Sequence, residues 1–105
     1  MTEPGERRRR TATAPERGHA PRGAGGAAER AAEGLSALIR HRLEGVSAVR
    51  RTDDDGWIVN IDVLELARIP DTTSLLAVYE VELDSTGELT QYRRIARYRR
   101  GAQDQ

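Results

Sequence analysis

The chain has 105 residues, which is enough for one domain. It has no cysteine and its two histidines, His19 and His41, lie far apart, so disulfides and thiolate metal sites are excluded and a histidine-built metal site is not expected. No apolar run approaches the ~20 residues that span a bilayer, and no apolar segment follows Met1, which predicts a cytoplasmic protein without a membrane span. The 17 arginines balance the 17 acids in number only, because residues 1–25 carry a net charge of +3 and residues 26–105 a net charge of −3.

Residues 1–25 are predicted to be a disordered tail. They include seven glycines or prolines and only five hydrophobic residues, too little apolar surface to offset the entropy lost on ordering. Within the tail, Arg7–Arg10 is a run of four arginines that could bind nucleic acid or an acidic partner. We favour a solvated tail, because no aromatic residues are interleaved with these charges.

Residues 27–43 are predicted to form an amphipathic helix that ends before Gly45. Arg40 and Arg42, near its expected end, suit the helix dipole. Gly34 either allows the helix to lie close to a sheet or reflects neutral drift. The apolar residues recur at steps of three and four and form one stripe: Ala28, Ala31, Ala32, Leu35, Leu38, Ile39 and Leu43.

Three strands are predicted next, at residues 46–52, 57–66 and 75–84. The first turn, Asp53–Gly56, is expected to place Gly56 at positive φ; its three acids are consecutive, whereas the ligands of a calcium loop alternate. Residues 68–73 interrupt the pattern because Pro70 cannot donate to a ladder. Alternation predicts that the core includes Trp57, Val59, Ile61, Tyr79 and Val81.

A fourth strand is predicted at residues 88–98, with two registers left open. A two-residue hairpin loop would set Glu80 opposite Arg93 and bring Tyr92, Ala96 and Tyr98 to the core face, with Arg94 as an exception. A three-residue loop with a glycine bulge would set Leu83 opposite Leu89 instead. Part of this segment also fits a helical spacing.

One helix followed by a meander of three or four strands predicts an α+β domain of two layers, with the helix on one face of an antiparallel sheet. We expect this domain to cover residues 26–101, with a short C-terminal tail at residues 102–105.

The chain lacks the residue constellations that catalysis needs. No nucleophile stands beside a base, no glycine-rich phosphate loop occurs, and His41 reads as a surface residue near the helix end. We therefore expect no enzyme activity, no cofactor and no metal.

The arginines near the C-terminus, interleaved with Tyr92 and Tyr98, are open to three interpretations. They could pair with the acids of the neighbouring strand, dock an acidic protein, or stack and clamp RNA. The acidic neighbours count against RNA because they oppose the approach of phosphates.

About 60 residues, from Leu43 to Gly101, resemble the gas vesicle synthesis protein O family (GvpO). The segments that weigh most are Arg68–Thr72, with the sequence Arg-Ile-Pro-Asp-Thr, and Tyr79–Asp84, with the sequence Tyr-Glu-Val-Glu-Leu-Asp. Gly56-Trp57, Val63–Leu66, Gly87–Leu89, Tyr92–Arg94 and Arg97-Tyr98 fit in the same order. Residues 1–25 are outside the resemblance.

The resemblance implies an accessory protein for gas vesicle assembly, located in the cytoplasm with the vesicles, whose partners are other gas vesicle proteins. It implies no catalytic residues. A nucleic-acid-binding regulator of the same gene cluster is the alternative, and homo-oligomerisation stays open. As candidate contacts on the surface we predict Arg68, Pro70, Glu80, Arg94, Arg97 and Tyr98.

Overall fold

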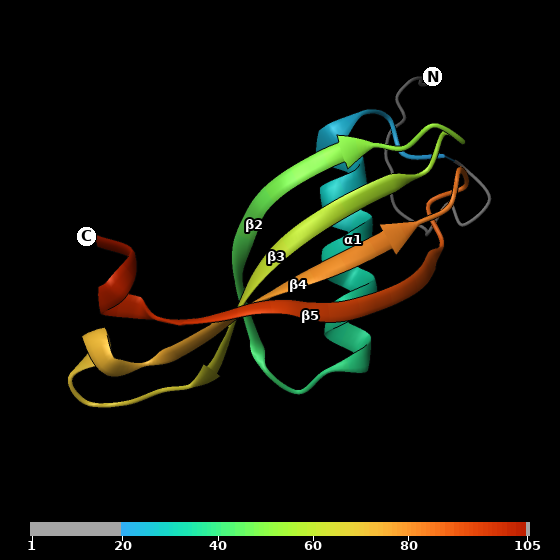
Figure 1. Ribbon diagram of the computed structural model, residues 1–105. Coiled ribbons are helices and arrows are strands. Elements are labelled where there is room, and N and C mark those ends of the chain that lie inside the picture. Colours follow the sequence, from blue (N-terminus) through green and yellow to red (C-terminus); the bar gives the residue numbers. More distant parts are fainter. Residues whose placement is uncertain (1–19, 105) are drawn as a thin grey trace, which may run out of the picture.

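The computed structural model describes residues 20–104 and shows one helix followed by a four-stranded antiparallel sheet (Figure 1). The helix is α1 (Ala24–Leu38), and the strands, which neighbour one another in chain order, are β2 (Arg42–Arg51), β3 (Trp57–Leu66), β4 (Leu75–Leu83) and β5 (Leu89–Arg99). Two short 3-10 helices, η2 (Asp71–Thr73) and η3 (Arg100–Asp104), flank the last hairpin. The predicted α+β fold is confirmed. Of the predicted tail, Arg7–Arg10 and His19 lie outside the described residues.

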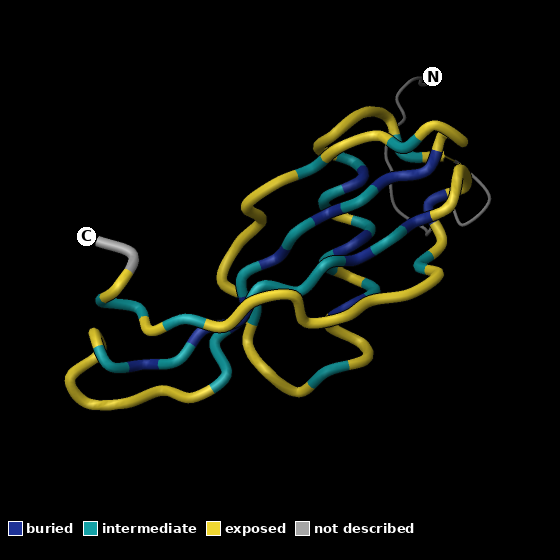
Figure 2. Tube along the Cα trace, viewed as in Figure 1, coloured by how far each residue is buried: buried dark blue, intermediate teal, exposed yellow. Residues whose placement is uncertain are grey.

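The hydrophobic core lies between α1 and one face of the sheet, where the buried residues form one layer (Figure 2). Strand β3 alternates between buried and half-buried residues along most of its length, as its sequence predicted. Tyr79 is half-buried at the margin of the core. The buried cluster comprises Ala27, Ala31, Leu35, Trp57, Val59, Ile61, Val63, Val81 and Leu83.

The helix begins and ends earlier than the predicted range of 27–43. Ile39 still donates its backbone N–H to the last turn but has an extended φ of −120°, and the chain enters β2 at Arg42. Residues 42 and 43 pair with β3, because ladder hydrogen bonds along the whole of β3 outweigh a helical periodicity of side chains. Leu38 is therefore 54% exposed rather than in the core, and Arg40 and Arg42 lie beyond the helix.

The turn between β2 and β3 differs from the prediction in its backbone. Positive φ occurs at Asp55 (67°) and not at Gly56. Gly56 is needed for space instead, because a Cβ at this position would overlap the carbonyl oxygen of Leu83. The β2–β3 turn thus packs directly against the β4–β5 turn. This contact joins segments that are distant in sequence, so it could not be predicted from the residues of the turn alone.

The pairing of β4 with β5 combines both registers considered from the sequence. Asp84 N–H donates to the Glu88 carbonyl at 2.9 Å, and Leu83 pairs with Leu89, as the three-residue loop predicts. Thr90 is then an extra residue, and beyond it Glu80 pairs with Arg93, as the two-residue loop predicts.

A second bulge lies at Ile95, and it corrects the expected faces of β5. Beyond it Ala96 pairs with Val78 and Tyr98 with Leu76, on the face away from α1. Tyr92 and Arg94 remain on the face that α1 covers in part. A bulge adds one residue and so reverses the alternation that follows it.

Both edge strands of the sheet are interrupted twice. In β2 the extra residues are Glu44 and Ser47, and in β5 they are Thr90 and Ile95. Bulges twist an edge and break its row of free backbone groups, so these edges are poor templates for another strand.

At Gly34 the helix α1 approaches β5 closely, since a Cβ there would lie 3.0 Å from Leu89 Cδ1. This supports the interpretation that Gly34 lets the helix lie close to the sheet. We expect Gly34→Val to lower the free energy of unfolding by about 1–2 kcal/mol, because the added atoms crowd Leu89. Gly25→Val is the control, as nothing lies within 4 Å of its Cβ position. Urea denaturation followed by Trp57 fluorescence measures both, and equal losses would contradict the crowding argument.

Candidate functional site

The six predicted contact residues do not form one surface. Their positions follow from strand pairing and from the loop between β3 and β4. Arg94 and Arg97 share the sheet face that carries α1, Glu80 and Tyr98 lie on the opposite face, and Arg68 and Pro70 lie in the β3–β4 loop.

On the helix-side face, Arg94 and Arg97 meet at a carboxylate that the sequence analysis did not select, that of Glu65. Arg94 Nη1 donates to both carboxylate oxygens, at 3.1 and 3.2 Å, and Arg97 Nε lies 3.1 Å from Oε1. The Tyr79 hydroxyl donates to Oε2 at 3.1 Å. The Glu65 side chain is only 7% exposed, whereas those of Arg94 and Arg97 are 46% and 53% exposed. We call these four residues the Glu65 cluster.

Two bulges assemble this cluster. Arg94 and Arg97 are three residues apart, which in a regular strand puts them on opposite faces. The extra residue Ile95 brings both to the face of Tyr79. Glu65 is itself the extra residue of β3, lying between Leu64 and Leu66 in the pairing with β4.

The cluster holds Glu65 in its charged form. Desolvation raises the pKa of Glu65, but hydrogen bonds from Arg94 and Tyr79 and the charges of Arg94 and Arg97 outweigh it, so the pKa lies below its ordinary value. Desolvation, together with the hydrogen bond to Glu65 and its charge, raises the pKa of Tyr79. The two arginines thus surround a fixed negative charge and remain half-exposed.

The opposite face has its own ion pairs. Arg93 Nε lies 3.1 Å from Glu80 Oε1, which agrees with the interpretation that the arginines pair with the acidic neighbouring strand. Tyr98 is half-buried over Leu76, and desolvation, followed by the charge of Asp62, raises its pKa. The Arg93–Glu80 pair is open to solvent on the arginine side, where water screens it, so it contributes little to stability.

The β3–β4 loop is held in place by contacts with the rest of the chain, while side chains at its tip are exposed to solvent. Arg68 donates its backbone N–H to Oγ of the buried Ser74 at 2.9 Å, and Asp71 forms an ion pair of 2.9 Å with Arg100 Nε. The side chain of Ile69, by contrast, is fully exposed.

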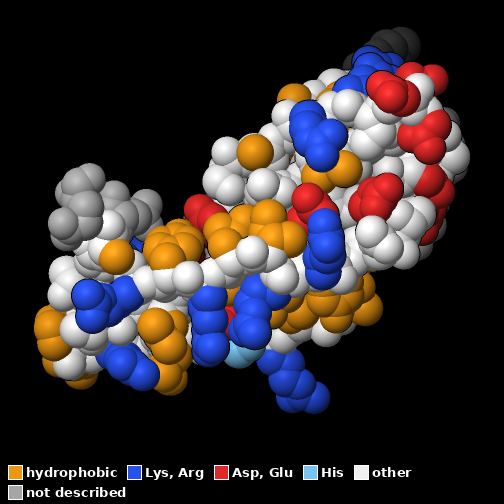
Figure 3. Space-filling view, viewed as in Figure 1, with side chains coloured by type: hydrophobic (Ala, Val, Ile, Leu, Met, Phe, Trp, Pro, Cys, Tyr) orange, Lys and Arg blue, Asp and Glu red, His pale blue; other side chains and the backbone are white. Residues whose placement is uncertain are grey.

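Charge separates along the molecule. Residues 52–57 and 80–91, which form the turn end, carry seven acids and no arginine. Residues 65–76 and 94–102, which we call the distal end, carry five arginines and two acids. On the face shown in Figure 3, acidic side chains gather at the turn end, while arginines and apolar side chains cover the distal end. The distal end extends beyond α1 and carries η2 and η3 (Figure 1).

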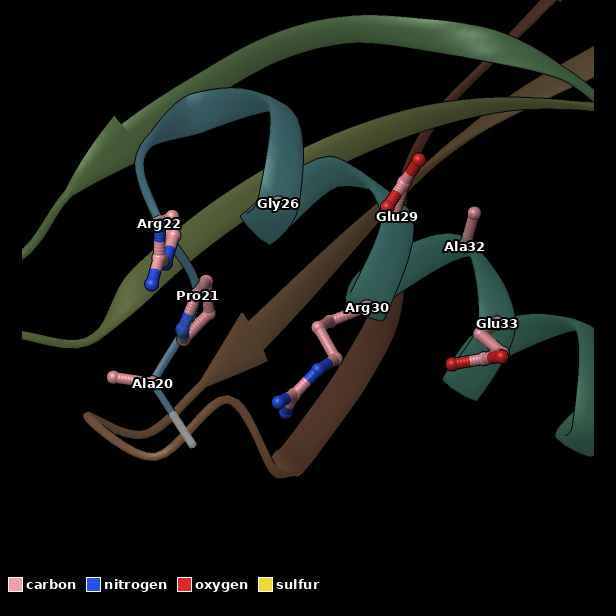
Figure 4. Close-up of a pocket in the computed structure, with 8 residues that line it drawn as sticks. All are labelled: Ala20, Pro21, Arg22, Gly26, Glu29, Arg30, Ala32 and Glu33. Carbon is pink, nitrogen blue, oxygen red and sulfur yellow. The ribbon is translucent and has the colours of Figure 1, made fainter. Parts of the chain in front are cut away.

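A shallow hollow lies between α1 and the residues that precede it (Figure 4). Arg30, on its rim, donates to the backbone carbonyl of Thr86 at 3.1 Å and so ties the helix to the β4–β5 turn. The residues that line the hollow are Ala20, Pro21, Arg22, Gly26, Glu29, Arg30, Ala32 and Glu33. They include no nucleophile paired with a base.

Within residues 20–104, no group of three or more histidine or acidic side chains is arranged to hold a metal ion. In this same range the structure has no helix long and apolar enough to cross a membrane.

Comparisons with known proteins agree with one another. The sequence profile described as "Gas vesicle synthesis protein GvpO" matches residues 10–104. Gas vesicle protein O of a Streptomyces species is 59% identical over 70 residues, covering 67% of this chain and 54% of that protein. Gas vesicle protein O1 of Halobacterium salinarum is 39% identical over 72 residues, covering 69% of this chain and 60% of that protein.

Gas vesicle protein O of Haloferax mediterranei is 36% identical over 72 residues, covering 69% of this chain and 51% of that protein. The chain thus spans a little over half the length of these relatives. No solved structure matches it.

Proposed function

This chain belongs to the gas vesicle synthesis protein GvpO family, and from that premise we propose that it supports vesicle formation by binding other gas vesicle proteins, without catalysing a reaction. Membership of the family supports a role in gas vesicle synthesis. The mode of action, by protein contacts made in the cytoplasm and on the forming vesicle, is our proposal.

The observation that carries the proposal is the Glu65 cluster. Glu65 fixes the guanidinium groups of Arg94 and Arg97, and half of each arginine side chain remains exposed. Arginines held in place lose little entropy on binding, and their planar donors match the carboxylates of a partner. The cluster is therefore suited to a protein partner with acidic side chains.

The alternative, a nucleic-acid-binding regulator, finds less support. Arg93, Arg94 and Arg97 each have a carboxylate within 3.1 Å. A nucleic acid presents a continuous row of phosphates, which would also meet these carboxylates, whereas a protein partner can bring a single carboxylate to one exposed guanidinium. Such a regulator would also show affinity that falls steeply as salt increases.

Deletion of the gene in a vesicle-forming host tests the proposed function. We expect vesicles to be lost or sharply reduced, and the wild-type gene to restore them. Affinity purification at moderate salt should recover other gas vesicle proteins and no nucleic acid. Normal vesicles in the deletion strain would refute the role, and recovery of nucleic acid alone would favour the regulator.

A single substitution tests the Glu65 cluster as a binding surface. Arg97→Gln removes one exposed guanidinium, while Arg94 keeps both of its hydrogen bonds to Glu65. We expect the affinity for the partner recovered above to fall about 5-fold, measured by titration calorimetry. Arg50→Gln, on the exposed β2, is the matched control and should leave affinity unchanged. Equal affinities of the two variants would remove the cluster from the interface.

A further inference from the structure

The β3–β4 loop presents an apolar tip. Ile69 is 100% exposed, Leu66 at the end of β3 is 45% exposed, and Pro70 is exposed as well. Single exposed apolar residues are common on protein surfaces and need no explanation. Here the tip differs because the backbone on both sides of it is held in place.

Hydrogen bonds fix the loop just before and just after the tip. Arg68 N–H is bound by Ser74 Oγ at 2.9 Å, and the Pro70 carbonyl accepts from Thr73 N–H at 2.9 Å and from Thr73 Oγ1 at 2.7 Å. Ser74, which is fully buried, donates its N–H to the Asp71 carbonyl at 2.9 Å. The loop is thus closed upon itself.

Helix η3 holds the same loop from the C-terminal side. Arg100 donates its N–H to the Ser74 carbonyl at 2.9 Å, and its Nε forms the ion pair with Asp71. Gly101 lies so close to Thr72 that a Cβ would be 2.9 Å from the Thr72 carbonyl oxygen. A loop held in this way loses little conformational entropy when its tip is bound, which favours a stable contact.

Charge at the distal end limits what the tip can bind. Arg68 adjoins the tip, and the distal end as a whole carries five arginines and two acids. An apolar pocket with a basic rim would be repelled, whereas one with an acidic rim is complementary in both shape and charge.

We propose that Ile69 is an apolar anchor that inserts into a pocket on another gas vesicle protein, and that acidic side chains on the rim of that pocket pair with Arg68. This inference rests on the proposed function, since it names the surface and the kind of partner through which that function is carried out. The geometry of the loop does not depend on the Glu65 cluster, because the loop is fixed by its own contacts.

The test uses the 105-residue chain, tagged and co-expressed in turn with each of the other gas vesicle proteins of a vesicle-forming host. We expect one of these proteins to bind. Ile69→Asp should then weaken binding ~10- to 100-fold, as expected for loss of a buried aliphatic anchor. Leu38→Asp is the matched control, because Leu38 is 54% exposed at the end of α1 and belongs to neither the loop nor the Glu65 cluster, and it should change affinity less than about 2-fold.

A second variant tests the rim. Arg68→Glu should lower the association rate and reverse the salt dependence of binding, without changing the urea midpoint of the chain. If wild-type chain binds a partner and both Ile69→Asp and Arg68→Glu bind it equally well, the loop inference is wrong and the proposed function stands. If wild-type chain binds none of the gas vesicle proteins, the proposed function fails and the loop inference fails with it.

Discussion

Gly56→Ala is expected to lower the free energy of unfolding by about 3 kcal/mol. The added Cβ would overlap the carbonyl oxygen of Leu83 and would lie 3.1 Å from Thr52 Oγ1. Neither neighbour can easily move. Leu83 is buried, and Thr52 and Gly56 hold each other through two hydrogen bonds, of 2.9 and 3.0 Å.

Urea denaturation followed by Trp57 fluorescence measures this loss, because Trp57 is 5% exposed in the folded chain. Gly45→Ala is the control, since Gly45 lies within β2 beside the bulge at Glu44 and nothing stands within 4 Å of its Cβ position. We expect Gly45→Ala to change stability by less than about 0.5 kcal/mol. Two variants of equal stability would show that the turns do not pack as described.

Glu65→Gln is expected to lower the free energy of unfolding by about 2 kcal/mol at neutral pH. The amide keeps the shape of the side chain but leaves Arg94 and Arg97 without the negative charge between them. Removing one member of a buried ion pair costs more than this, and we reduce the figure because both arginines are half-exposed and can be hydrated. Glu80→Gln breaks the more exposed pair with Arg93 and should cost less than about 0.5 kcal/mol.

The loss at Glu65 should also depend on pH. The pKa of Glu65 is lowered on folding, so its carboxylate stabilises the fold above the ordinary value of 4.5, and this contribution disappears as pH falls through the folded value. The difference in stability between wild type and Glu65→Gln should therefore shrink between about pH 7 and about pH 3. A difference that stays constant over this range would contradict the assignment of charge to Glu65.

Side-chain alternation was sufficient to predict the central strands. Trp57, Val59 and Ile61 are buried on one face of β3, and Val81 joins them from β4. In these strands the alternating apolar residues of one face pack against α1, so the sequence alternation matches the observed burial. The predicted end of the helix was wrong. An apolar Leu43 fits both a helical stripe and a paired strand, so its sequence pattern does not distinguish the two. The long-range pairing of Leu43 with β3 selects the strand.

The bulges account for what could not be predicted at the candidate site. An extra residue such as Ile95 or Glu65 carries no signature of its own type, yet it decides which side chains share a face. One signal was available: Glu65 continues the buried series that ends at Val63, two residues before it. A carboxylate in that position requires cationic partners, and these come from Arg94 and Arg97, two strands away.

The interrupted borders of the sheet affect how this protein can be recognised. Because β2 and β5 each contain two bulges, main-chain addition of a foreign strand is disfavoured on either side. Recognition then depends on individual side chains rather than on a continuous run of peptide groups. In a systematic alanine scan, partner binding should accordingly be sensitive at a few scattered positions, and substitutions there should leave the stability of the fold unchanged. A single mutation could then abolish binding to one partner and leave binding to another intact.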